Sequence, residues 1–272
     1  MKVKVSGPII TNDIAWLYDW FGEEYFCPAT LEAAVQEADP EDREVILEIN
    51  SPGGYVFAGF ETYSILQELQ RSGYRVEAHV TALAASAAST IMCACDTVLL
   101  SPVAQVMIHL PMTVTEGNRY DHRDSIAVLK SLEESILNGY EKKSRGKASR
   151  EQLRAAMEKS AWMPAQEAIS LGLADGILGD EEMIITAVDI GAIASRVVNS
   201  LQEGYGLSFE EMLARYEEGV RSGQMEAHPQ HPVAMQGPEQ DLTALCGGEE
   251  EQQDRSWQAE ARLALERQRF LS

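Results

Sequence analysis

A serine, a histidine and a glycine-rich turn stand in three separate segments whose residue types suit acyl transfer. Ser86 lies in "ALAASAAS", a run of small residues between a predicted strand and a predicted helix. A serine attacks a carbonyl carbon only when a base takes its proton and hydrogen-bond donors hold the oxyanion. A helix N-terminus offers free N–H groups and a dipole that favours negative charge. The segment therefore predicts a nucleophile at Ser86, with neighbours small enough to admit a peptide backbone.

The base and the oxyanion donors each have one candidate segment. His109, in "MIHLP", follows a predicted strand, whereas His79 lies within a strand and His122 on an exposed helix, so His109 is the best general base. The turn "NSPGG", residues 50–54, follows a buried strand, and its glycines let backbone N–H groups face a ligand. Taken alone, each piece also has an ordinary interpretation, as a structural histidine or a tight turn.

Composition limits the class of protein. The chain has 272 residues, of which 45% are hydrophobic, enough for one large domain or for one domain with a tail. No apolar run reaches the roughly 18 residues of a membrane helix, and the start "MKVKVSGPII" alternates like a strand, unlike a signal peptide. We therefore expect a cytoplasmic protein with no membrane partner. A net charge of −21, with no lysine after Lys159, disfavours nucleic-acid binding.

The sequence predicts no metal or cofactor. The cysteines are expected to be buried, reduced thiols. His228 and His231 have no acidic or thiol ligand at a suitable spacing. The only "GK" pair, Gly146 and Lys147, lacks the spacing of a phosphate-binding loop, so the chain has no ATPase motif of its own. The cysteines are Cys27, Cys93, Cys95 and Cys246.

Strands and helices alternate along the first 180 residues, which predicts an α/β fold with repeated strand–helix units and a mostly parallel sheet. Thr11 or Asn12 is expected to cap the first helix and Thr30 to begin the second. In "AGFETYSILQELQRSG", Phe60, Tyr63, Leu66 and Leu69 are expected on one side of a helix. The predicted strands are residues 1–10, "EVILEINSPGG", "YRVEAHVTAL", "DTVLLSP", "AQVMIHL" and a last strand into Ile177.

A long polar helix is predicted over residues 122–147. Its apolar residues recur every three or four positions, which requires a surface to bury them. Ser149 is expected to cap the helix that follows. We divide the chain into a domain at 1–180, a mixed apolar and acidic extension at 181–221, and an acidic tail at 222–272. The tail is predicted to be largely disordered, with a terminal amphipathic helix. The apolar residues of the long helix are Ile126, Leu129, Leu132, Ile136 and Tyr140.

The three segments, in this order, resemble the ClpP-type serine peptidases, the proteolytic subunit of the Clp protease. "EINSPGG" is similar to that family's oxyanion turn, "ALAASAAS" to its nucleophile segment, "VMIHLP" to the segment with its histidine, and "WMPAQEAISLGLADGIL" to the stretch after its acidic residue. "VSGPIITNDIAWLYDWFG", "GYVFAG", "IHLPMTVTEGN" and the acidic extension resemble the phage and prophage branch, described as head maturation proteases.

The resemblance implies a crotonase-like α/β fold that stacks into rings, a heptamer or a double ring, with the helix at 122–147 as the handle that pairs rings. It implies Ser86 as nucleophile, His109 as base, and the N–H groups of Gly54 and Ala87 as the oxyanion hole. Ser160 stands where the family has a carboxylate. Ser160 could accept the imidazole N–H directly or through a water, another carboxylate such as that of Glu158 could replace it, or the peptidase could be inactive.

The expected function is hydrolysis of peptide bonds in unfolded or loosely structured proteins such as scaffold or capsid components. The expected location is the bacterial host cytoplasm or the assembling phage capsid, and a separate ATPase is a possible partner. Two alternatives stay open. One is an inactive ClpP-fold protein for capsid assembly or scaffolding. The other is a crotonase-type acyl-CoA enzyme, which would use carboxylates beside an oxyanion hole in place of the serine.

Overall fold

A computed structural model describes residues 1–179 and 209–228. The chain divides into two compact units, Met1–Gly206 with Leu271–Ser272, and Leu207–Phe270. The predicted domain at 1–180 falls in the first unit. Much of the predicted extension and tail, including the terminal amphipathic helix and Cys246, lies outside the described residues.

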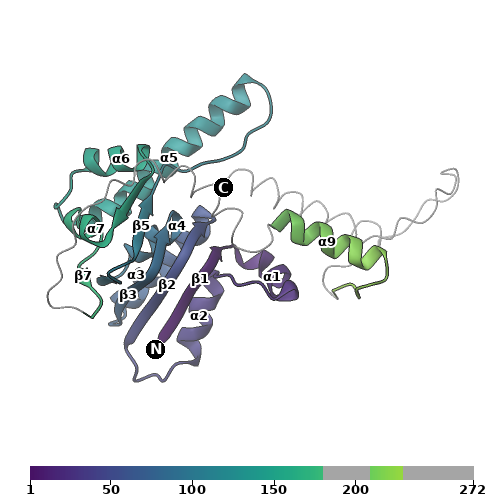
Figure 1. The fold of residues 1–272 in the computed structure, drawn as a ribbon, viewed down its shortest axis with the longest axis horizontal. Helices are drawn as coiled ribbons and strands as arrows, with labels where there is room; N and C mark the ends of the chain where they lie inside the picture. Colours follow the sequence, from purple (N-terminus) through teal and green to yellow (C-terminus); the bar gives the residue numbers. More distant parts are fainter. Residues whose placement is uncertain (180–208, 229–272) are drawn as a thin grey trace, which may run out of the picture. The chain divides into compact units, whose positions relative to one another are not determined.

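Strands and helices alternate in the first unit, which confirms the predicted α/β class (Figure 1). The order is β1 (Lys2–Ile9), the short 3-10 helix η1 (Asn12–Ile14), α1 (Ala15–Phe21), α2 (Pro28–Glu37), β2 (Glu44–Gly54), α3 (Val56–Arg71), β3 (Arg75–Ala85), α4 (Ala87–Met92), β4 (Thr97–Leu100), β5 (Gln105–Ile108), α5 (Arg119–Ser144), α6 (Arg150–Glu158), β6 (Ala161–Pro164), α7 (Ala165–Ser170) and β7 (Gly176–Ile177). The second unit contains α9 (Phe209–Arg221).

The strands of the described residues form one sheet in the order β1-β2-β3-β4-β7. These neighbours pair in parallel. The long strand β3 changes partner along its length: it pairs with β4 up to Val80 and with β5 from Leu83. The short strand β6, which the sequence pattern did not predict, pairs with β5 in the antiparallel direction. The change of partner brings the ends of β2, β3 and β5 together, which is where parallel α/β sheets place ligands.

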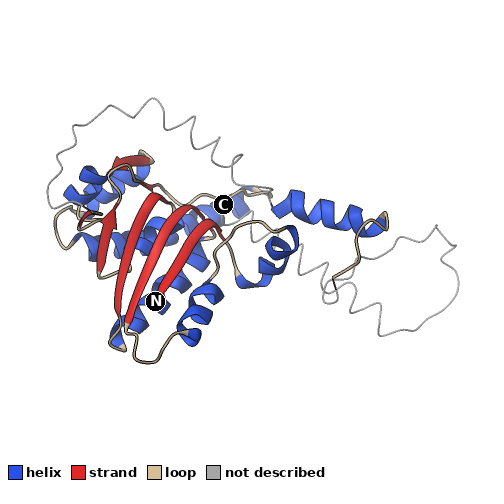
Figure 2. Ribbon diagram, turned by 60° about the horizontal axis from the view of Figure 1, so that its bottom comes forward, coloured by secondary structure: helices blue, strands red, loops and turns tan. Residues whose placement is uncertain are grey.

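The sheet is apolar on one face and charged on the other. Figure 2 shows helices gathered on one face, and the residues of β1 and β2 that point to that side are buried. On the other face Lys2 pairs with Glu48 at 3.0 Å. Arg75 pairs with Glu77 at 2.8 Å, and the Nε2 atom of His79 lies 2.5 Å from a carboxylate oxygen of Glu77. This alternation of period two fixes the register of the strands.

Several predicted helix details were wrong. Thr11 stands at the N-cap position of η1, but its side chain forms no capping hydrogen bond. The side chain of Asn12 accepts a hydrogen bond from the N–H of Ala29, at the start of α2. The helix α2 begins at Pro28, so Thr30 lies inside it. Proline suits the first position of a helix because the N–H that it lacks would have no partner within the helix. In α3 the buried residues are Ala58, Gly59, Thr62 and Leu66, and of the predicted apolar side only Leu66 is fully buried. The capping box of Ser149 with Gln152 confirms the prediction for α6.

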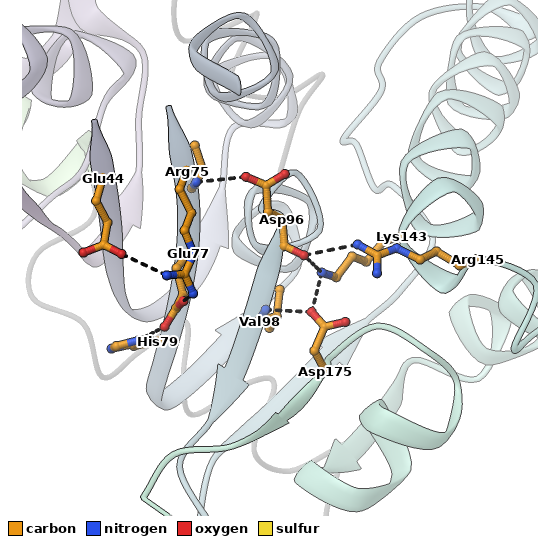
Figure 3. A network of polar contacts seen from close by, with 10 residues as sticks. Glu44, Arg75, Glu77, His79, Asp96, Val98, Lys143, Arg145 and Asp175 are labelled. Atoms are coloured by element: carbon orange, nitrogen blue, oxygen red, sulfur yellow. Dashed lines mark hydrogen bonds and ion pairs between the residues drawn. The ribbon is translucent and has the colours of Figure 1, made fainter. Parts of the chain in front are cut away.

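The long helix α5 is held to the sheet at its C-terminal end. Asn118 and Asp121 form a capping box at its start, and Arg145, in a left-handed conformation, ends it. Figure 3 shows Lys143 of α5 pointing toward Asp96 and Asp175. The Lys143 ammonium donates to a carboxylate oxygen of Asp175 at 2.6 Å and to the carbonyl of Asp96 at 3.2 Å. A buried ammonium needs such partners, so this cluster fixes α5 relative to β4 and β7.

The predicted apolar residues of α5 differ in burial along the helix. Leu132, Ile136 and Tyr140 are buried within the chain. Leu129 is half-buried, and Ile126, nearer the start of the helix, keeps 54% of its surface exposed. Val128, which was not among the predicted residues, keeps 45%. The first half of α5 therefore presents apolar side chains that the described residues do not cover.

Candidate active site

Ser86 lies at the junction between β3 and α4 in a strained conformation, with φ of 53° and ψ of −125°. Such a backbone costs about 1–3 kcal/mol for a non-glycine residue and persists only when its surroundings hold it. Its N–H donates to the carbonyl of Met107 in β5 at 2.9 Å, and its carbonyl accepts from the N–H of Ser89 at 3.0 Å. The nucleophile candidate is thus tied to the strand that leads to His109.

The small residues after Ser86 allow close packing of α4. Ala87 and Ala88 are buried, and the buried glycine Gly59 of α3 packs against Ala87. A Cβ added at Gly59 would lie 3.2 Å from the Cβ of Ala87, closer than ordinary contact. Larger side chains in α4 would separate the two helices and move the end of β3. The alanine-rich composition is therefore a packing requirement beside Ser86.

His109 contacts Ser86 directly. Its Nε2 atom lies 2.7 Å from the Oγ atom of Ser86, the distance of a good hydrogen bond. Burial lowers the pKa of His109 below its usual 6.5, although a hydrogen bond with the backbone of Leu110 opposes this shift. Because the neutral imidazole is the form that accepts a proton, the lowered pKa keeps His109 available as a base at neutral pH.

The glycine turn touches the Ser86 junction. Strand β2 runs to Gly54, and Ser51 pairs with Ala84 of β3. Gly53 is buried with φ of 95°, and a Cβ added there would lie 2.6 Å from the carbonyl oxygen of Ala85 and 2.9 Å from the N atom of Ala87. Only glycine fits this approach. The predicted donors on Gly54 and Ala87 therefore belong to two segments in contact.

Ser51 fixes the shape of this turn, and this role was not predicted from the sequence. Its buried hydroxyl donates to the carbonyl of Gly7 at 2.7 Å and accepts from the N–H of Gly53 at 3.1 Å. Because both bonds are buried, losing the hydroxyl would leave polar backbone groups without partners. The residue stands inside the quoted "NSPGG" motif, where its polarity in a buried strand was the available signal.

Ser160 reaches the site by the register of β6. The antiparallel ladder of β5 and β6 ends at the pair Ile108 and Ala161, and His109 and Ser160 are the residues next to that last pair. Ser160 has φ of 48°, and its N–H donates to the carbonyl of Met157 at 2.9 Å. In the part of the chain that the structure describes, no carboxylate forms an ion pair with His109. Glu158 ends α6 with an exposed side chain. The structure thus brings Ser86 and His109 into contact, and Ser160 lies next to the end of the strand pair that leads to His109.

Metal ligands, membrane helices and cysteines also bear on the expectations for residues 1–179 and 209–228. No group of three potential metal ligands gathers there, and no helix there is long and apolar enough to cross a membrane. The three described cysteines, Cys27, Cys93 and Cys95, are buried and unbridged. Burial raises the pKa of Cys93 to about 12, so this thiol stays protonated at neutral pH.

Comparison with known proteins adds sequence relatives for the region that carries this site. The sequence model described as Clp protease matches residues 30–181. The chain is 34% identical over 139 residues to the ATP-dependent Clp protease proteolytic subunit 1 of Chlamydia muridarum, covering 49% of this chain and 69% of the relative. It is 32% identical over 150 residues to the ATP-dependent Clp protease proteolytic subunit of Porphyromonas gingivalis, covering 53% of this chain and 63% of the relative.

Proposed function

This chain belongs to the Clp protease family, and on that basis we propose that it is a serine endopeptidase with Ser86 as nucleophile and His109 as general base. The observation that carries the proposal is the 2.7 Å contact between the Oγ atom of Ser86 and the Nε2 atom of His109. A serine hydroxyl beside a half-buried imidazole, at the start of a helix, suits attack on an acyl group.

The proposed reaction proceeds through an acyl-enzyme. His109 takes the proton of the Ser86 hydroxyl while Oγ bonds to the carbonyl carbon of the peptide, and the oxyanion accepts hydrogen bonds from the N–H groups of Gly54 and Ala87. The C–N bond then breaks as His109 gives the proton to the leaving amine. Water, deprotonated by His109, attacks the ester and releases Ser86 with a carboxylic acid product.

The third position distinguishes this site from a Ser–His–Asp triad. An acidic residue holds the imidazole in one tautomer and stabilises its protonated form, and replacing it in the best-known serine proteases lowers turnover by about 10⁴. We propose that the Ser160 hydroxyl takes this third position and accepts the imidazole N–H directly or through a water. We infer an active but slower peptidase.

We propose protein substrates that are unfolded or loosely structured, and assembly into a ring, a heptamer or a double ring. The exposed apolar residues in the first half of α5 support an assembly through that helix, since Ile126 and Val128 lie uncovered. The sequence has no ATPase motif, so folded substrates would require a separate ATPase partner. Maturation of a phage head, by cleavage of scaffold or capsid components in the host cytoplasm or in the assembling capsid, is the finer proposal. This finer proposal rests only on the resemblance of sequence segments such as "GYVFAG" and "IHLPMTVTEGN" to the phage and prophage branch.

The test compares purified protein with its Ser86→Ala and His109→Ala variants. We expect the parent to cleave an unfolded protein such as reduced, alkylated casein, and both variants to lose most of this activity. Intact-mass analysis of the same samples tests self-processing, which predicts a shortened chain only in the parent. If folded, assembled parent protein cleaves nothing while it still binds capsid subunits, the assembly role replaces the peptidase. Acyl-CoA chemistry would instead require activity that survives Ser86→Ala.

A further inference from the structure

A chain of buried hydroxyl groups leads from α5 to the backbone of Ser86. The Oγ atom of Ser89, in α4, donates to the carbonyl oxygen of Ser86 at 2.6 Å. The same Oγ atom lies 2.7 Å from the phenolic oxygen of Tyr140, on α5. Ser89 is fully buried and Tyr140 is 1% exposed, so water does not compete for these bonds.

The direction of each bond follows from counting protons. A serine hydroxyl has one proton, and that of Ser89 is used on the Ser86 carbonyl. Tyr140 must therefore donate its own proton to Ser89. Burial raises the pKa of the Tyr140 phenol, so it keeps this proton at all physiological pH values. The chain of donors runs one way, toward Ser86.

The Ser86 carbonyl is one half of the peptide group whose other half is the Ala87 N–H. A trans peptide group is planar, and its C=O and N–H point in opposite directions. The described part of the chain has no cis peptide bond. A bond that fixes the direction of the Ser86 carbonyl therefore also fixes the direction of the Ala87 N–H. Hydrogen bonding to a carbonyl also polarises the N–H of the same peptide group and makes it a better donor.

We propose that Ser89 and Tyr140 are positioning residues that aim the Ala87 N–H at the oxyanion. This inference rests on the proposed function, in which Ala87 supplies one of the two oxyanion donors. The Ser86 carbonyl also accepts from the N–H groups of Ser89 and Thr90, at 3.0 and 3.4 Å, and the bond from the Ser89 hydroxyl, at 2.6 Å, is the shortest of the three. It adds to the bonds that hold the strained backbone of Ser86 in place. Neither residue touches the substrate, and both act through the Ser86–Ala87 peptide.

The effect should fall on turnover and leave substrate binding unchanged. An oxyanion forms only as the carbonyl carbon is attacked, so a misdirected N–H weakens the transition state and not the bound substrate. Removing an oxyanion donor outright costs about 10²–10³ in kcat, and loosening one should cost part of that. We expect Ser89→Ala to lower kcat about 10-fold and Tyr140→Phe to lower it about 3-fold, with KM within about 2-fold of the parent.

The experiment uses the full-length protein, a fluorogenic peptide amide for kcat and KM, and a fluorophosphonate probe for the reaction rate of Ser86. Thr62→Val is the matched control, since it removes a buried hydroxyl that donates only to the carbonyl of Ala58 in its own helix. We expect that control to keep the parental kcat. Because Tyr140 acts through Ser89, the double variant should resemble Ser89→Ala alone. The pH midpoint set by His109 should not move in any variant.

Parental kcat in both single variants would overturn the inference, as would additive losses in the double variant or an equal loss in Thr62→Val. If Ser89→Ala fails to fold, Tyr140→Phe decides by itself, because it preserves the ring and removes one oxygen. A parent that takes up no fluorophosphonate at Ser86 overturns the proposed function and the inference together. A labelled parent whose positioning variants react at the parental rate overturns the inference alone.

Discussion

Gly53→Ala should lower peptidase activity, because the added methyl group would press on the backbone beside Ser86. Gly53 is buried with φ of 95°, and an added Cβ would lie 2.6 Å from both the Ala85 carbonyl oxygen and the Ser86 Cβ. Ordinary contact begins near 3.4 Å, so the turn or the Ser86 junction must move by about 0.8 Å. A displacement of about 1 Å in a reacting group can cost about 10²-fold in rate.

Gly73→Ala is the matched control. Gly73 has φ of 89°, nearly the same conformation, and a Cβ added there has no atom within 4 Å. Both variants bear the backbone cost of a left-handed alanine, about 1–2 kcal/mol in the free energy of unfolding. Gly53→Ala should lose about 1–3 kcal/mol more, because its methyl group overpacks the site.

The assay is urea unfolding for stability together with hydrolysis of a fluorogenic peptide for kcat. We expect Gly73→Ala to retain parental kcat and Gly53→Ala to lose about 100-fold. The reasoning would be refuted if Gly53→Ala kept parental turnover, or if the two variants lost equal stability. Either result would mean that the turn does not press on Ser86 as the distances indicate.

Three further predictions concern charge. The ratio kcat/KM should rise with pH as His109 loses its proton, and the midpoint of this rise should lie below pH 6.5 because burial lowers the pKa of His109. A midpoint at or above pH 6.5 would contradict the lowered pKa. Ser160→Asp should move this midpoint upward by about one pH unit, because the proposed third position would then hold a carboxylate that favours the protonated imidazole, and Ser160→Ala should not move it upward. Lys143→Met should lower the free energy of unfolding by about 3 kcal/mol, because it leaves Asp175 without its ion-pair partner. This value is at the low end of the range for a broken buried ion pair, since the Asp175 side chain keeps 30% exposure and stays partly hydrated. Exposed Lys130 is the control, and urea unfolding of Lys130→Met should show a change below about 0.5 kcal/mol.

The pairing of Ser86 with His109 could be predicted because chemistry restricts the candidates. Few residue types can act as a nucleophile or as a general base. Ser86 and His109 are of such types, and each follows a predicted strand. Parallel strands place their ends at one edge of a sheet, so local patterns were enough to bring the two residues together.

The contacts that refine the site could not be predicted in the same way. The exchange of partners along β3 depends on register between distant strands, and β6 has four residues and no distinctive pattern. Tyr140 was identified only as part of an apolar stripe. Its bond to Ser89 joins residues 51 positions apart, and no local signal reports such a contact.

The role of Asn12 at the first helix was mispredicted for a related reason. Asn12 is a good capping residue, but the N–H that its side chain accepts from belongs to the next helix, at Ala29. Propensity indicates which residues can cap, whereas the chain path between η1 and α2 decides which helix benefits.

The most direct test of the central claim is the mass of the protein after reaction with a fluorophosphonate, followed by localisation of the adduct. The account predicts one adduct per chain, on Ser86, which forms much more slowly in His109→Ala and not at all in Ser86→Ala. An adduct on another residue, or equal labelling in folded protein with and without the His109 imidazole, would contradict the claim that these two side chains act together.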